Sequence, residues 1–314
     1  MQSLKKYSNI TGLLVFFISL FVYYHSVERT GSLWDCGEFI LGAYKLQVVH
    51  PPGAGLFVII GRMFAWLATV FSDDPADIAF AVNLMSAICT SIAAMMIAWT
   101  TIMFGKLALL GRNTDTSNAE NIALSFAGLV AGLATAFSTS IWFSAVEGEV
   151  YAMSTMFTVM TLWAATKYYY IEDESEALRW LVLSLFVSGM SVGVHLLSIL
   201  SLPAIALLVY YKKYKEHTIK GALIAMAAGV AAIVFIMKVV IVGIPTLWKN
   251  MELLFVNSFG LPVHSGIIPT LLIVAAVGYF GVKYAQKKGS QLLQVAAISA
   301  ILITVAFSTI GVVV

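Results

Sequence analysis

Long apolar runs, separated by short polar segments, make up most of the chain. A helix needs about 20 mainly apolar residues to cross the hydrocarbon core of a bilayer, and most of these runs are close to that length. We therefore predict an all-α integral membrane protein, with 1–314 forming a single transmembrane domain of about nine transmembrane helices. The predicted spans are 8–27, 78–104, 121–143, 150–170, 179–197, 198–211, 221–243, 267–283 and 291–314.

The composition agrees with this pattern. Hydrophobic residues make up 60% of the chain and charged residues only 11%, whereas soluble domains carry roughly 25% charged residues. The runs are long enough for helices and too long for barrel strands. The net charge of +2 is too small to indicate a nucleic-acid partner. The two cysteines lie in unlike contexts, so we expect neither a disulfide framework nor a cysteine metal site.

Segment 53–71 is the one apolar run whose placement changes the topology. If it does not span the membrane, 13 of the 18 basic residues fall in loops on the N-terminal side, which the positive-inside rule assigns to the cytoplasm. If it spans, Arg62 lies in mid-membrane at a cost of about 2.5–3.5 kcal/mol. We therefore predict that 53–71 lies along the outer membrane surface. The first outer loop, 28–77, then carries two interfacial helices, and 78–314 forms the remaining bundle.

Asp35 and Glu38 form an acidic pair in this outer loop. Their i, i+3 spacing places both on one face of a short helix over 36–48. Asp35 in a partly apolar surround is a candidate general base for a hydroxyl group. The alternative is a capping box, in which Asp35 is the N-cap and Glu38 the N3 residue of that helix.

His50 and the following Pro51-Pro52-Gly53 can be interpreted in two ways. The prolines and glycine can start a helix whose free backbone amides bind an anion, with His50 and Arg62 assisting. The alternative is a rigid turn that only redirects the chain between two interfacial helices.

Four further residues are candidates for the outer site. Glu147 and Glu149 lie between two predicted spans, and their i, i+2 spacing puts them on different faces. Glu149 also has a structural interpretation, since negative charge at a helix N-terminus is favourable. His195 is predicted at the outer end of its helix, where a membrane histidine is a candidate functional residue; a hydrogen-bonded structural histidine is the alternative. Lys238 is expected either to snorkel to the interface or to meet a phosphate. No metal-binding spacing is present, so no metal site is predicted.

Three stretches of the chain carry a family resemblance. They are WDCGEFILGAYKLQVVHPPGAGLF, STSIWFSAVEGEVYAMS and SGMSVGVHLLS, in that order. Together with the first helix and its acidic outer loop, they resemble the GT-C superfamily of membrane glycosyltransferases, which includes the protein O-mannosyltransferases. They are most similar to the bacterial members of glycosyltransferase family 117. The resemblance covers residues 1 to about 211.

The resemblance implies a site and a reaction. A sugar would pass from a polyprenyl-phosphate donor to an acceptor hydroxyl of a protein or glycan, with protein Ser/Thr favoured, by an inverting mechanism with Asp35 as catalytic base. We expect Glu38, Glu147 and Glu149 to position the acceptor or sugar. His195 is expected to help position these groups, while His50, Arg62 and Lys238 would serve the cavity or the donor phosphate.

The resemblance also implies a location: the inner membrane of a bacterium, with a cytoplasmic N-terminus and a periplasmic site. The donor lipid is the expected cofactor-like partner, together with membrane lipid. Dependence on a divalent metal is left open. The alternative from another class is a transporter or flippase for a lipid-linked or small polar substrate, although no internal repeat supports it. Because the sequence stops within an apolar run, we expect a C-terminal truncation.

Overall fold

The computed structural model describes residues 2–50, 53–112, 114–290, 293–298, 300–301 and 303–305. These residues form helices and no strands, which confirms the all-α prediction. They divide into two compact units, Met1–Ile199 and Leu200–Ser308, and each is described by itself.

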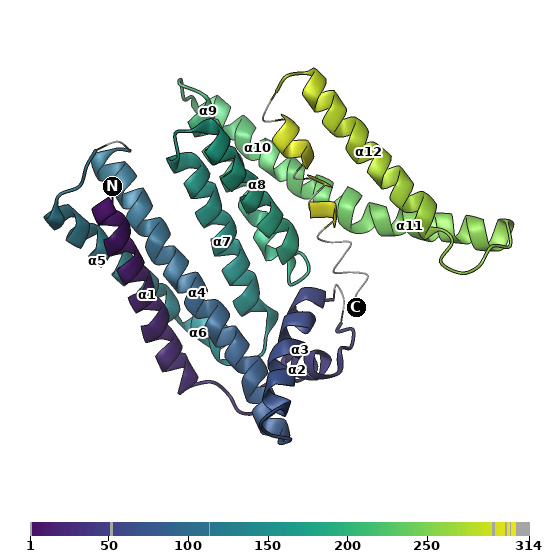
Figure 1. The fold of residues 1–314 in the computed structure, drawn as a ribbon, viewed down its shortest axis with the longest axis horizontal. Coiled ribbons are helices and arrows are strands. Elements are labelled where there is room, and N and C mark those ends of the chain that lie inside the picture. Colours follow the sequence, from purple (N-terminus) through teal and green to yellow (C-terminus); the bar gives the residue numbers. More distant parts are fainter. Residues whose placement is uncertain are drawn as a thin grey trace. The chain divides into compact units, whose positions relative to one another are not determined.

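The first unit is a helical bundle whose helices are joined by short irregular connections (Figure 1). Its shorter helices, α2, α3 and α6, lie between longer ones. Its elements are α1 (Gln2–Tyr24), α2 (Cys36–Lys45), α3 (Gly55–Thr69), α4 (Pro75–Leu110), α5 (Asn118–Ala136), α6 (Thr139–Val146), α7 (Val150–Tyr170), α8 (Glu174–Ser191) and most of the 3₁₀ turn η1 (Leu196–Ser201).

Local sequence signals explain where several of these helices begin. Asp74 caps α4 by accepting a hydrogen bond from the backbone N–H of Ala76, with Pro75 in the first turn. Ser117 and Glu120 form a reciprocal capping box at the start of α5. Each cap satisfies an amide that the helix itself leaves without a partner.

Helix α4 is the centre of this unit and packs against α1, α3, α5 and α7. With 36 residues it is about 54 Å long, at about 1.5 Å per residue. The hydrocarbon core of a bilayer is about 30 Å thick, so a part of α4 extends beyond it. One apolar core joins α4 to α2, α3 and α7, and another joins it to α1, α5 and α6.

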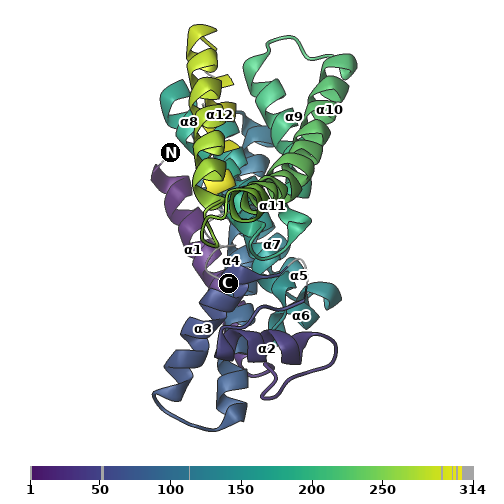
Figure 2. The same cartoon turned by 90° about the vertical axis from the view of Figure 1, so that its right-hand side faces the viewer.

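Helices α2 and α3 lie at the end of the bundle where α4 begins, as Figures 1 and 2 both show. Gly61 allows their close approach, because a Cβ added there would lie 2.8 Å from the Cβ of Ala43. α3 has 15 residues and falls short of a full membrane span. The expectation that 53–71 does not cross the membrane therefore fits its length, and its placement along the membrane surface stays a prediction.

The second unit begins at Leu200 and continues through α9 (Leu202–Lys213) and α10 (Ile219–Phe235). After α10 the helix goes on through the π-helical η2 (Ile236–Gly243), α11 (Ile244–Leu253) and the π-helical η3 (Leu254–Ser258). A loop then leads to α12 (Ile267–Lys287). The predicted end of the span 221–243 is therefore wrong, because the helix continues past Gly243 and Pro245 is tolerated in the first turn of α11.

Two predicted spans also end differently in the first unit. The run 121–143 is divided between α5 and α6, because Ser138 begins a new helix after Phe137. The run 179–197 ends early, since α8 stops at Ser191. The described residues contain six helical segments that are long and apolar enough to cross a membrane, which supports a multi-pass protein. They are Ser3–Tyr24, Pro75–Leu110, Asn118–Ala136, Leu196–Lys213, Ile219–Ser258 and Ile267–Lys287.

Candidate active site

Asp35, Glu38 and His50 come together at the end of the first unit where α2 lies. The Nδ1 atom of His50 is 3.0 Å from Oε2 of Glu38, and its Nε2 atom is 3.9 Å from Oδ2 of Asp35. The backbone N–H of His50 also donates to Oε1 of Glu38, at 2.6 Å. All three side chains are about half exposed, so the cluster is accessible from solvent.

The capping box predicted for Asp35 and Glu38 is wrong. Asp35 occupies the N-cap position of α2, but its side chain makes no capping hydrogen bond. The Glu38 carboxylate bonds to His50 instead of the N-cap backbone. Both carboxylates are thereby turned toward His50 and away from the helix end. The acidic pair is therefore a feature of the site and does not serve to start the helix.

The turn between α2 and α3 brings His50 back over α2. Leu46 ends α2 in the left-handed region with φ 52°, and Phe39 of α2 supports the imidazole with its ring centroid 5.5 Å away. The backbone N–H of Gly53 donates to the carbonyl of His50 at 2.9 Å. The Gly53 amide is thus used within a turn, which favours the turn interpretation of this segment. Pro51 and Pro52 lie outside the described residues.

The contact between Glu38 and His50 shifts the pKa of both groups. The hydrogen bonds from His50 hold the pKa of Glu38 below its usual range. The hydrogen bond to Glu38 raises the pKa of His50, with the charges of Glu38, Asp35 and Glu149 acting in the same direction. An imidazolium at this position is surrounded by carboxylates, so the cluster holds a proton more tightly than isolated histidine does.

Glu149 is the buried carboxyl group of the site. It is the N-cap of α7 and only 7% exposed, and its side chain makes no capping bond. Burial raises the pKa of Glu149 to about 7, and the charges of Asp35 and Glu147 act in the same direction. Glu147, two residues earlier, accepts a hydrogen bond from the hydroxyl of Ser32. Asp35 and Glu147 therefore both act electrostatically on Glu149.

Asn83 of α4 joins the loop before α2 to the helical bundle. It was not among the residues predicted for the site. It is fully buried, and its side-chain amide donates to the carbonyls of Glu28 at 2.8 Å and Thr30 at 3.1 Å. Its Oδ1 accepts from the thiol of Cys36 at 3.9 Å. A Cβ at Gly148 would come within 2.7 Å of the same oxygen. The available signal was a single asparagine within the apolar run 78–104.

The other predicted site residues make contacts of their own or lie outside this unit. His195 lies in the turn after α8, and not at a helix end as predicted, with its ring 5.3 Å from that of Tyr151. The guanidinium of Arg62 donates to the carbonyl of Tyr44, which joins α3 to α2. Lys238 lies in η2 of the second unit. Their roles toward a phosphate or sugar stay predictions.

A divalent cation also fits the described side chains. One ligand atom each from Asp35, Glu38 and His50 lies within 4.8 Å of the others. Carboxylate and imidazole groups are common ligands of divalent ions. The three residues thus form the group that would hold such an ion, a grouping that the sequence analysis did not foresee.

The raised pKa of Glu149 predicts how stability depends on pH. Above its ordinary value of 4.5 the carboxyl ionises in the unfolded chain, while the folded chain keeps it protonated up to about pH 7. The folded state therefore binds more protons in this window, and its stability falls as the pH rises from 4.5 to about 7. We expect Glu149→Gln to remove the part of this decrease in folding stability that the Glu149 carboxyl group causes. Thermal unfolding of the purified protein at a series of pH values measures it.

Glu120→Gln is the matched control for that experiment. Glu120 lies in the exposed capping box of α5, and its hydrogen bonds with Ser117 lower its pKa. Its contribution has the opposite sign, since it stabilises the folded state above pH 4.5. The control should keep the Glu149-dependent fall in stability. If Glu149→Gln unfolds with the same pH dependence as the unmodified protein, Glu149 does not retain its proton in the folded state.

Comparison with known proteins identifies the relatives of this chain. The family described as Protein O-mannosyl-transferase TMEM260 N-terminal domain matches residues 35–218, which is more than half of the chain. The Protein O-mannosyl-transferase tmem260 of Dictyostelium discoideum is 28% identical over 166 residues, which cover 52% of this chain and 18% of that protein. The chain thus spans about a fifth of the length of this relative. No solved structure matches the chain significantly.

Proposed function

Because the chain belongs to the protein O-mannosyl-transferase TMEM260 N-terminal domain family, we propose that it forms the membrane core of a glycosyltransferase. It transfers a sugar from a polyprenyl-phosphate donor to a serine or threonine hydroxyl of a protein. The observation that carries this proposal is the overlap between the family match and the acidic site. The match begins at Asp35 and includes Glu38, His50 and Glu149.

Asp35 is the base in this mechanism. Its carboxylate takes the proton of the acceptor hydroxyl while the hydroxyl oxygen attacks the anomeric carbon of the sugar. The bond between that carbon and the phosphate oxygen breaks, and polyprenyl phosphate leaves with the bonding electrons. Attack from the opposite side inverts the configuration at the anomeric carbon. Asp35 suits this role because its half-exposed side chain makes no capping bond and is open to an incoming hydroxyl.

The side chains around Asp35 orient the base and bind the sugar or the acceptor. Glu38 fixes His50 by two hydrogen bonds, and His50 faces Asp35 at 3.9 Å. This arrangement favours the protonated form of His50 beside the base and fixes the imidazole. Glu149, with a pKa of about 7, is partly protonated near neutral pH and can donate a hydrogen bond to a sugar or acceptor oxygen. His195 lies beside Tyr151, two residues after Glu149, and is the candidate on this side for positioning the sugar or acceptor.

A lipid-linked donor agrees with the character of the chain. The sugar then reaches the site through the bilayer, and no nucleotide-binding domain is required. We assign the donor phosphate to the basic candidates of the first unit, His50 and Arg62. The excess of basic residues in the opposite loops supports an outward-facing site in a bacterial inner membrane.

The direct test is a transfer assay with purified full-length protein. We expect a labelled mannose residue to pass from polyprenyl-phosphate mannose to a serine- or threonine-containing acceptor protein. Mass spectrometry of the product locates the sugar on a hydroxyl side chain, and its anomeric configuration reports inversion. GDP-mannose, offered in place of the lipid donor, should give no product, because the proposal includes no nucleotide site.

The transporter alternative makes a different prediction in the same preparation. Proteoliposomes that move the lipid-linked sugar across the bilayer, with no covalent product on any acceptor, would replace the enzyme proposal by that of a flippase. Transfer from GDP-mannose would retain the enzyme and overturn the assignment of the donor.

A further inference from the structure

A cavity lies at the end of the same bundle away from the acidic cluster. It has a volume of about 510 Å³ and is formed by the start of α1, the last turns of α4 and α7, and the connection between α4 and α5. Cavities of about 300–1,000 Å³ are typical of ligand sites. α4 and α7 both run from the acidic cluster toward this cavity, and α7 alone has 21 residues, or about 30 Å. The cavity is therefore separate from the proposed active site.

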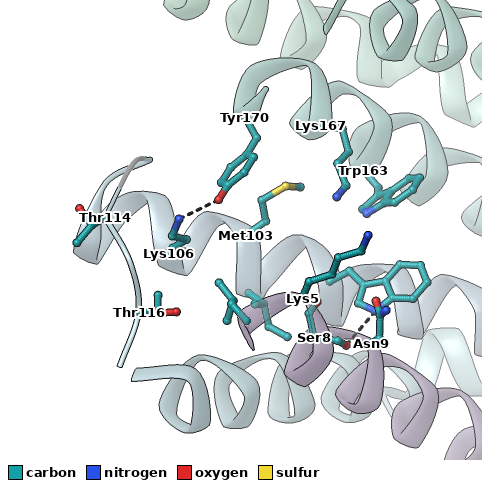
Figure 3. Close-up of a pocket in the computed structure, with 13 residues that line it drawn as sticks. Lys5, Ser8, Asn9, Met103, Lys106, Thr114, Thr116, Trp163, Lys167 and Tyr170 are labelled. Atoms are coloured by element: carbon teal, nitrogen blue, oxygen red, sulfur yellow. Dashed lines mark hydrogen bonds between the residues drawn. The ribbon is translucent and has the colours of Figure 1, made fainter. Parts of the chain in front are cut away.

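Three lysine side chains face this cavity, namely Lys5, Lys106 and Lys167 (Figure 3). Among the described residues that line it, none is acidic. The charges of Lys5 and Glu176, the latter outside the cavity lining, act on Lys167 in opposite directions, and Figure 3 draws the amines of Lys5 and Lys167 beside Trp163. Like charges that share a cavity repel one another, so a bound anion would relieve this repulsion.

Lys106 is the most buried of the three, at 2% exposure. Its ammonium group donates to the hydroxyl of Tyr170 at 3.0 Å and to the carbonyl of Arg112 at 2.8 Å. Both of these partners are neutral, and together they use two of the three donors of the ammonium group. A buried charge is costly unless it is paired and hydrogen-bonded. Lys106 is thus a preoriented donor for an anion that enters the cavity.

Aromatic side chains form the rest of the wall. The indoles of Trp99 and Trp163 lie with their ring centroids 5.8 Å apart, and the ammonium group of Lys167 lies 5.6 Å from the ring centroid of Trp163. The Trp99 indole N–H donates to the carbonyl of Ser8, which fixes that ring against α1. A ligand with an anionic head group and an apolar part would match the lysine side and the tryptophan side of this cavity.

We propose that this cavity binds a phosphate monoester, with Lys5, Lys106 and Lys167 around the phosphate and the two indoles against the adjoining carbon skeleton. α4 is long and apolar enough to cross a membrane and runs from the region of the acidic cluster to this cavity, so we place the cavity at the membrane boundary opposite the acidic cluster. Basic pockets between transmembrane helices bind lipid headgroups at such positions. The phosphate belongs either to a membrane lipid or to a soluble ester.

Binding of two probes to the purified full-length protein tests the proposal and separates these sources. In the lipid arm, the protein is placed in phosphatidylcholine nanodiscs with increasing phosphatidic acid, and bound lipid is counted by native mass spectrometry. In the soluble arm, glycerol 3-phosphate is titrated into phosphatidylcholine nanodiscs. We expect the K5Q/K167Q double variant to bind the preferred probe about tenfold more weakly or worse, since each lost contact is a charge-assisted hydrogen bond.

Lys6→Gln is the matched control, because Lys6 adjoins Lys5 and is exposed but does not line the cavity. Circular dichroism and thermal unfolding confirm that all variants are folded. Loss in the lipid arm alone identifies a lipid headgroup, and loss in the soluble arm identifies a soluble phosphate ester. Either result supports the site. Equal affinities of K5Q/K167Q and K6Q in both arms would overturn it.

Discussion

Replacing Asp35 with asparagine is expected to lower sugar transfer by about 100-fold to 10,000-fold, the usual contribution of a positioned general base. Asparagine keeps the size of the side chain and its place at the start of α2, but it cannot take up the acceptor proton. Asp35 makes no capping bond, so the helix should not depend on its charge. The measurement is the rate of transfer from polyprenyl-phosphate mannose by the full-length protein, with folding checked by thermal unfolding.

Asp73→Asn controls for the loss of one carboxylate from this loop region, because Asp73 is exposed and lies in the turn after α3. This variant should transfer sugar at the original rate. The transfer rate of Glu38→Gln should lie between the rates of Asp35→Asn and Asp73→Asn, because Glu38 acts on the reaction through its hydrogen bonds with His50. Wild-type transfer by a folded Asp35→Asn protein would contradict the assignment of Asp35 as base.

The fold could be predicted from the sequence where an apolar run ends in a clear polar signal. Asp74 with Pro75 and Ser117 with Glu120 mark the starts of α4 and α5 within three residues of the predicted spans. The division of 121–143 was missed because Ser138, a common N-cap residue, is only weakly polar within that run. The helix that continues past Gly243 was missed because π-helical turns leave no pattern in the sequence.

The sequence indicated most residues of the candidate site, but it did not indicate how they contact one another. Asp35 and Glu38 were paired by their helical spacing, whereas His50 was assigned to a separate phosphate site. Their contact depends on the path of residues 46–50, where Leu46 adopts a left-handed conformation that no residue preference announces. Likewise, the burial that sets the pKa of Glu149 comes from long-range packing.

Asn83 shows which information the sequence alone does not supply. A polar side chain within an apolar helix indicates that a partner exists, but the sequence does not say where. Its partners are backbone carbonyls more than 50 positions earlier in the chain, in the loop before α2. The structure shows that this one amide joins α4 to the segment that leads into Asp35. The loop before α2 is therefore held in position by a residue outside it.

Asn83→Ala is expected to destabilise the protein by about 2–4 kcal/mol, because two carbonyls and the Cys36 thiol lose a buried partner. It should also lower transfer strongly, since the loop 28–35 would no longer be held against α4. Thermal unfolding measures the first effect. The transfer rate, measured below the unfolding temperature, reports the second.

Asn121→Ala is the matched control for this variant. Asn121 is also fully buried, but it lies at the start of α5 and donates to the hydroxyl of Ser3, at the end of the bundle away from the acidic cluster. This control should lose stability and keep its transfer rate, so the pair separates positioning from general stability. If both variants lose the same fraction of transfer, Asn83 supports only the fold, and the acidic cluster does not depend on this contact for its geometry.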